Sequence, residues 1–135
     1  MQNTHSFGKN AVISELAKQG FSVSHIKGGL LANDKTIEVK CCNSDNEWVK
    51  SQKILGGWDR IDPVNFDNLV CAVFDDGFDW IRYFIFSQSE VREFPKAVWK
   101  DAPESRNLTL VKGEERTDEI VKSSENVWNK ILSTK

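Results

Sequence analysis

The sequence predicts a mixed α/β fold in the order helix, three strands, helix, two strands and a final amphipathic helix. Residues 36–42 alternate polar and apolar side chains with a period of two, which is typical of a half-buried strand. Residues 66–74 form a strongly apolar run, as expected for a strand buried on both faces. Residues 114–132 place apolar side chains at helical spacing. These patterns favour a mixed central sheet with one crossover.

The first third of the chain is expected to contain one helix and three strands. Apolar residues of 10–19 form a helical stripe, and Gly20 suits the C-terminal stop. Residues 21–27 alternate as a strand, and the two glycines that follow allow a bend. Residues 30–32 form a second short strand, and Asn33 with Asp34 makes a tight-turn pair before the third strand, 36–42. The second and third strands should therefore form a hairpin.

The middle of the chain begins with a capping box, Ser44 to Glu47, which predicts a helix ended by the glycines at 56 and 57. The stretch that follows, through residue 65, is interpreted as a loop that carries Trp58. Strands are expected at 66–74 and 79–86, with a turn between them.

A second capping box, Ser87 to Glu90, predicts a short helix that Pro95 ends. Residues 108–111 fit an edge strand, and 114–132 one long helix. Trp80 and Trp128 sit in apolar patterns and are expected in the core. No repeat or linker divides the chain, so residues 1–135 are expected to form a single domain.

Composition is ordinary for a globular protein, with 39% hydrophobic and 28% charged residues. The net charge of −2 excludes a strongly basic protein, although residues 1–60 carry 8 Lys/Arg against 6 Asp/Glu. A nucleic-acid face is therefore expected toward the first half.

The three cysteines cannot all pair, and reduced thiols without a signal peptide predict a cytoplasmic protein. No apolar run approaches membrane-spanning length, so no membrane partner is expected.

The third strand carries the chemistry that stands out. Glu38 and Lys40 lie two residues apart and therefore project from the same face. A carboxylate can hold a divalent metal there, and the ammonium can orient or deprotonate a water, which suits metal-assisted phosphodiester hydrolysis. The same Glu-x-Lys also fits a solvated surface pair.

The order of elements around Glu38 and Lys40 resembles the PD-(D/E)XK nuclease superfamily, the restriction-endonuclease-like fold with its αβββαβ core. The resemblance runs from about residue 8 to residue 90 and is similar to small Holliday-junction resolvase-like members. The residues that carry it are 8–21, 30–32 and 37–40. It implies a Mg²⁺- or Mn²⁺-dependent endonuclease with Glu38 as metal ligand and Lys40 beside the attacking water. DNA is then the expected partner, and a homodimer is possible because two strands must be cut.

The acids that the resemblance implies are incomplete. Hairpin pairing around the turn at 33–34 sets Gly29 opposite Glu38, where the family has a metal-binding Asp. Many members of the family also have a Glu in the first helix, and the matching position in this sequence is Lys9. Glu15, Asp34 or an acid from residues 45–62 could complete a metal site around Glu38. Alternatively, the fold is retained while hydrolysis is lost.

Candidate substrate contacts are Lys9 and Lys27 for phosphates and Trp58 for bases. No zinc-ligand spacing, nucleophilic triad or phosphate-binding loop is present. Three hypotheses follow: a metal-dependent DNA endonuclease, a catalytically inactive nuclease-fold module that binds DNA or a protein, and an unrelated α/β domain whose Glu-x-Lys is a surface pair.

Overall fold

A five-stranded mixed sheet forms the centre of the molecule, whose computed structural model describes residues 4–96 and 104–132. Its strands are β1 (Val23–Ile26), β2 (Gly29–Ala32), β3 (Lys35–Asn43), β5 (Asn68–Phe74) and β6 (Ile81–Ser87), in the order β1-β2-β3-β5-β6. Only β3 and β5 are parallel, and their crossover contains α2 (Glu47–Ser51), β4 (Ile54–Ile61) and a 3-10 turn, η1 (Pro63–Asn65). The predicted fold class, α/β with a mixed central sheet, is confirmed.

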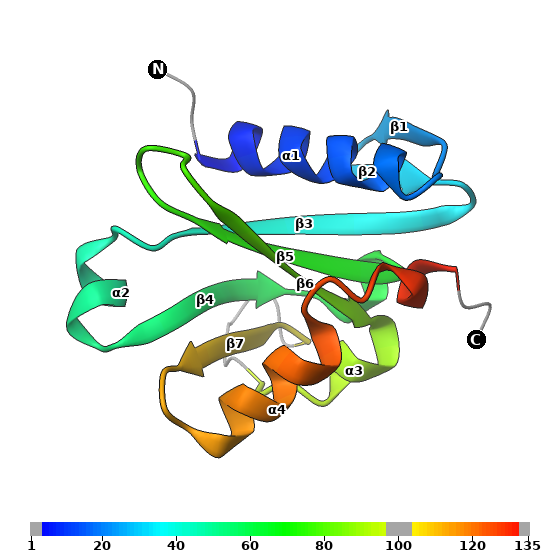
Figure 1. Cartoon of the computed structure of the whole chain (residues 1–135). Helices are drawn as coiled ribbons and strands as arrows, with labels where there is room; N and C mark the ends of the chain where they lie inside the picture. The colour runs from blue at the N-terminus through cyan, green and yellow to red at the C-terminus, as the bar shows by residue number, and fades with distance from the viewer. Residues whose placement is uncertain (1–3, 97–103, 133–135) are drawn as a thin grey trace.

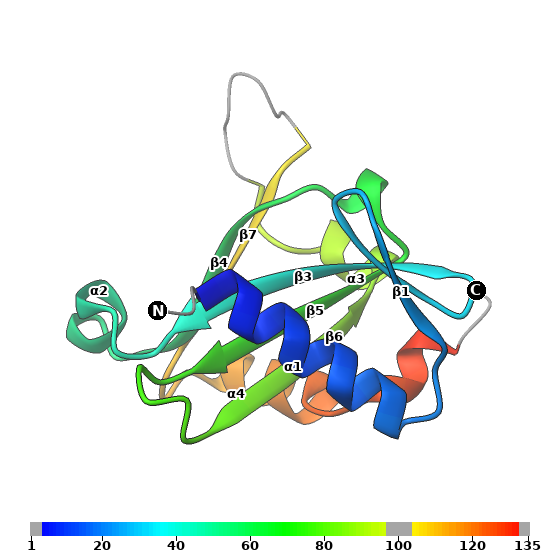
Figure 2. The ribbon, with the colours of Figure 1, turned by 90° about the horizontal axis from the view of Figure 1, so that it is seen from above.

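The helix α1 (Thr4–Lys18) covers one face of this sheet and runs diagonally across it from β3 toward β6 (Figure 2). Its buried residues Val12 and Leu16 pack on side chains of the alternate positions of β3 and β5, such as Ile37 and Val70. The helix begins six residues earlier than the sequence predicts, at Thr4 instead of residue 10.

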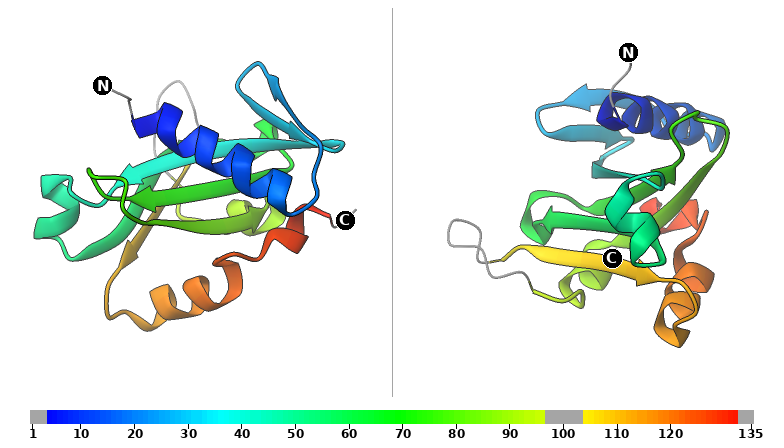
Figure 3. Two further views of the ribbon diagram at one scale, coloured as in Figure 1. Left: turned by 45° about the horizontal axis from the view of Figure 1, so that its top comes forward. Right: turned by 90° about the vertical axis from the view of Figure 1, so that its left-hand side faces the viewer.

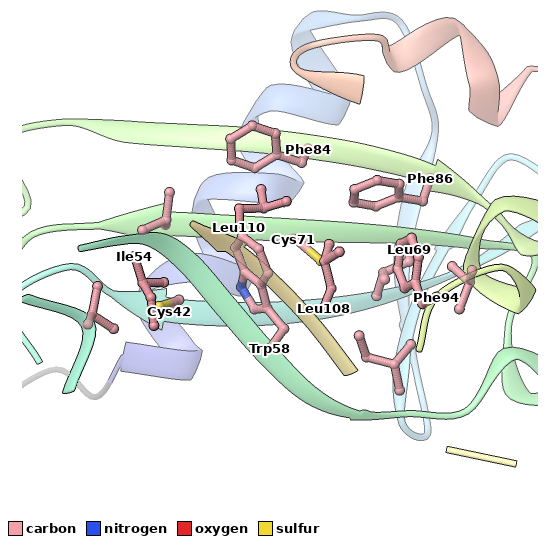
Figure 4. Close-up of a cluster of buried hydrophobic side chains, with 14 of the residues drawn as sticks. Cys42, Ile54, Trp58, Leu69, Cys71, Phe84, Phe86, Phe94, Leu108 and Leu110 are labelled. Carbon is pink, nitrogen blue, oxygen red and sulfur yellow. The ribbon is translucent and has the colours of Figure 1, made fainter. Parts of the chain in front are cut away.

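The other face of the sheet is covered by a two-stranded ribbon and by helices (Figures 1 and 3). Strand β4 pairs antiparallel with β7 (Arg106–Val111), and α3 (Gln88–Arg92) and α4 (Glu115–Ser124) pack beside them. The core on this side contains Trp58, Leu108 and Leu110 from the ribbon, which face Cys71 and Phe84 from the sheet (Figure 4). The molecule thus has two apolar cores, one on each side of β3 and β5.

The helix predicted from the capping box at residues 44–47 is present but shorter than expected, and the interpretation of the stretch after it as a loop is wrong. The helix ends at Ser51, and Asn46 rather than Ser44 caps it by accepting a hydrogen bond from the Trp48 amide. Residues 54–61 form β4 instead of a loop, so Trp58 lies in a strand and is buried. Pairing with β7, about fifty residues later, stabilises this strand.

The C-terminal helix is also shorter than predicted. It ends at Ser124, and the chain bends through Asn126, whose φ is +58°, into a separate 3-10 turn, η2 (Trp128–Ile131). The bend has a tertiary cause, because the Glu125 carboxylate forms two hydrogen bonds with Arg82 of β6. Trp128 is buried as predicted, whereas Trp80 is 43% exposed and the prediction that it lies in the core is wrong.

The second capping box is confirmed, because the Ser87 side chain accepts from the Glu90 amide and the Glu90 carboxylate accepts from the Ser87 amide. The edge strand predicted at 108–111 is present as β7. No helix in the described part of the chain is long and apolar enough to cross a membrane.

Candidate nuclease site on the open edge of β3

The strand β3 has one free edge beside its candidate catalytic residues. β2 pairs only with Lys35, Thr36 and Ile37, and no strand follows along that edge within residues 4–96 and 104–132. Glu38 and Lys40 therefore come directly after the last pair of the β2–β3 hairpin. The hairpin register is the one that the turn at 33–34 predicts.

A hollow of about 340 Å³ opens at this edge, where the start of α1 meets β3. Glu38 and Lys40 line it from the strand, and Thr4 and His5 line it from the helix. The helix comes this close because residue 8 has no side chain: a Cβ at Gly8 would overlap the Sγ atom of Cys41. Close packing of α1 on β3 thus places the first turn of the helix beside the Glu-x-Lys pair.

The Glu38 carboxyl lies in a mixed electrostatic environment. Burial raises the pKa of Glu38 above its ordinary value, and the nearby charge of Asp62 raises it further, whereas Lys40, His5 and Lys9 lower it. Asp62 follows the end of β4, and its Oδ1 atom accepts a hydrogen bond from the Val64 amide at 3.1 Å. A second carboxylate therefore acts on Glu38 from a different element of the fold.

The position opposite Glu38 is closed to a side chain. Gly29 is buried, and a Cβ there would overlap the backbone oxygen of Ile37. The absence of an acid at position 29 is therefore built into the close approach of β2 to β3. Asp62 lies in the 45–62 region in which the sequence allowed a replacement acid, but no local pattern distinguishes it from the other acids there.

The remaining candidates lie in several places. Lys9 acts on Glu38 from α1, whereas Glu15 acts electrostatically on Tyr83 of β6. Ten residues of helix separate Glu15 from His5, which is roughly 15 Å along the axis. Asp34 is exposed in the β2–β3 turn, and Lys27 is exposed in the β1–β2 turn. The charge of Lys9 thus acts on Glu38, although Lys9 is not among the described residues that line the hollow, and the other three candidates lie at separate positions.

The last candidate, Trp58, points into the core beneath the β4–β7 ribbon (Figure 4). Its Nε1 atom donates a hydrogen bond of 3.2 Å to the carbonyl oxygen of Ala72. The polar atom of this indole is therefore already bonded inside the protein. The sequence pattern had no means to reveal this, because it did not predict β4.

The carboxylate of Glu38 fits one part of a magnesium coordination shell, which waters and substrate phosphate oxygens would complete. Mg²⁺ is usually bound by one or two carboxylates and keeps waters and substrate phosphate oxygens as its other ligands. Glu38 lines the hollow with one carboxylate, and Asp62 is a second carboxylate whose charge acts on it. No group of three or more His, Cys, Asp or Glu side chains within the described ranges could hold a metal ion by itself. The protein therefore offers a partial site rather than a closed cage.

Comparison with solved structures finds a full-length structural likeness. The chain is similar to a bacterial homing endonuclease, I-Ssp6803I, with a TM-score of 0.60 over 96% of this chain and 88% of that chain. The two sequences are 13% identical, so the likeness establishes a shared nuclease-like fold. No protein-family model matches the chain, and no curated protein matches it.

Proposed function

We propose that this protein is a divalent-metal-dependent nuclease of the PD-(D/E)XK type, with Glu38 and Asp62 as the acidic residues and Lys40 beside the attacking water. The observation that carries the proposal is the open hollow at β3, where Glu38 and Lys40 lie together and the charge of Asp62 acts on Glu38. The nuclease-like fold of the whole chain supports it.

Each residue then has a chemical role. A bound Mg²⁺ would supply positive charge to the scissile phosphate. Lys40 orients a water for attack on phosphorus. The water oxygen bonds to phosphorus as the bond to the departing ester oxygen breaks, the proton of the water passes to solvent, and the departing oxygen takes up a proton from solvent. Lys9 and His5, on the first turns of α1, are placed to contact phosphate oxygens of the same strand. Because the two carboxylates are only part of a coordination shell, metal should bind more tightly in the presence of nucleic acid than in its absence.

The test is nicking of supercoiled plasmid DNA in Mg²⁺, in Mn²⁺ and in EDTA. Wild type should nick with either metal and not in EDTA. Glu38→Gln, Asp62→Asn and Lys40→Ala should each lower the rate by at least about a hundredfold, as expected for groups that act in the transition state. Asp118→Asn, an exposed acid on α4, is the matched control and should nick like wild type.

Nicking that survives Glu38→Gln would overturn the assignment. The same assay on Glu15→Gln and Asp34→Asn decides whether either of these acids takes part as a metal ligand. Calorimetric titration with Mn²⁺, with and without an oligonucleotide, measures metal binding independently of cleavage.

A second function is favoured by the closed position at Gly29 and by the basic groups that surround Glu38. Three of them, Lys40, His5 and Lys9, act on a single partly buried carboxyl. This arrangement also suits a nuclease-fold module that binds phosphates, or an acidic protein partner, without hydrolysis. Metal-independent binding of an oligonucleotide by a protein that fails to nick with either metal would select this function.

A further inference from the structure

The Glu38 hollow is the first of three that follow one another along β3 and onto the β4–β7 ribbon. It shares Cys41 with a second hollow of about 190 Å³, which reaches Asn43 and Trp48. The second shares Trp48 and Gly57 with a third of about 370 Å³. This third cavity, here called the Trp48 hollow, is lined by Trp48, Gly57, Trp58, Asp59, Asn107 and Thr109.

Trp48 presents an aromatic surface between the second and third hollows. The side chain lies on the short helix α2 and is 52% exposed, whereas the neighbouring Trp58 is 5% exposed. A Cβ at Gly57 would lie 3.1 Å from the indole Cζ3 atom, so the ring packs against backbone that carries no side chain. The glycine in β4 thus supports the ring while half of its surface stays open to a flat ligand.

Asn107, one of the residues that line the Trp48 hollow, carries a polar atom without a partner. The Oδ1 atom of Asn107 is buried and accepts no hydrogen bond from any residue that the structure describes. A buried acceptor left unpaired is costly, so a ligand whose N–H group comes within reach of it as the Asn107 side chain turns gains affinity. Trp58 offers no such donor, because its Nε1 atom is bonded to the Ala72 carbonyl.

The charge of the Trp48 hollow indicates which part of a nucleotide it can take. Among the residues that the structure describes, its lining contains the exposed carboxylate of Asp59 and the hydroxyl of Thr109, and no Lys or Arg. A phosphate would be repelled there. A nucleobase is flat, neutral and edged with N–H donors, so it can stack on Trp48 and donate to Asn107.

We propose that the Trp48 hollow binds an unpaired nucleobase of the strand that the Glu38 site engages. This proposal rests on the function proposed above for the ligand being a nucleic acid. The preference for a base over a phosphate rests on Trp48 and Asn107. Three residues of β3, roughly 10 Å, separate Lys40 from Asn43 at the border of the second hollow. The sugar–phosphate chain would pass along this border between the two sites.

The test is fluorescence anisotropy with a labelled twelve-residue oligothymidine and with an abasic strand of equal length and charge. EDTA is present throughout, so the measurement does not depend on cleavage. Trp48→Ala should weaken binding of oligothymidine about tenfold (about 1.4 kcal/mol) and leave the abasic strand unchanged. Trp48→Phe should keep most of the affinity, and Asn107→Ala should weaken the same probe.

Trp80→Ala is the matched control, because Trp80 is also exposed but is not among the residues that line the three hollows. It should bind both probes like wild type. The proposal is overturned if Trp48→Ala binds like wild type, if the abasic strand binds as tightly as oligothymidine, if no single strand binds, or if a duplex binds more tightly than either. A protein that fails to nick plasmid but passes this test loses the proposed catalysis and keeps the base site.

Discussion

The packing of α1 on β3 should be most sensitive to a single methyl group at Gly8. A Cβ there would overlap Cys41 Sγ and lie 3.2 Å from Cε2 of the fully buried Phe74. Overpacking of this kind costs about 1–3 kcal/mol, and the better helix propensity of alanine returns up to about 1 kcal/mol. Gly8→Ala should therefore lower the free energy of unfolding by about 1 kcal/mol.

The structure also indicates how to reverse this loss. Replacing Cys41 with alanine removes Sγ, after which the Cβ atoms of residues 8 and 41 would be in ordinary contact at 3.4 Å. In the Cys41→Ala background, Gly8→Ala should be neutral or stabilising by up to about 1 kcal/mol, because the Phe74 ring, still 3.2 Å away, has only to shift by a few tenths of an ångström. The coupling energy between the two positions should thus be roughly 1–2 kcal/mol.

The assay is urea denaturation of wild type, both single variants and the double variant, with unfolding monitored by tryptophan fluorescence. Asn10→Ala, on the exposed face of α1, controls for helix propensity alone and should not couple to Cys41→Ala. If Gly8→Ala costs the same in both backgrounds, the reasoning from the Gly8–Cys41 contact is refuted.

Three further predictions concern the site and its support. Gly29→Asp adds the acid that the nuclease resemblance implies. It should destabilise the fold by about 2 kcal/mol, because the Ile37 backbone blocks the new side chain. Calorimetric titration with Mn²⁺ should therefore find no gain in metal affinity. Burial raises the pKa of Glu38 above 4.5, so ionisation of this carboxyl opposes folding. Glu38→Gln should therefore raise the Tm at pH 7, and the difference in Tm from wild type should shrink as the pH falls to 4.5. Arg82 holds the pKa of Glu125 below 4.5, so Glu125→Gln should lower the free energy of unfolding by about 1 kcal/mol at pH 7. The loss should become smaller as acid protonates the carboxyl, and equal losses at pH 7 and pH 3 would argue against this ion pair.

Local patterns were sufficient to predict the part of the site that lies on one strand. The alternation of residues 36–42 assigned Glu38 and Lys40 to one face of β3, and the turn at 33–34 predicted Gly29 opposite Glu38. Both predictions depend on contacts between residues fewer than ten positions apart. Side-chain direction and hairpin register follow from such short separations because the strand period and the turn length specify them.

The contribution of β4 could not be predicted in this way. Two glycines at 56 and 57 indicated the end of a helix, yet in the folded protein they lie in a strand and leave room for the rings of Trp58 and Trp48. Whether a glycine ends a helix or makes space in a strand depends on the partner that packs against it. That partner, β7, lies about fifty residues away in the sequence.

The set of groups that act on Glu38 is likewise a tertiary property. The charges of Asp62 and His5 act on Glu38 from the end of β4 and from the first turn of α1. Their proximity results from how α1 and β4 cross β3, which no spacing in the sequence encodes. Periodicity can show which residues share a face of one strand, whereas the packing of separate elements determines which charges from the rest of the chain surround them.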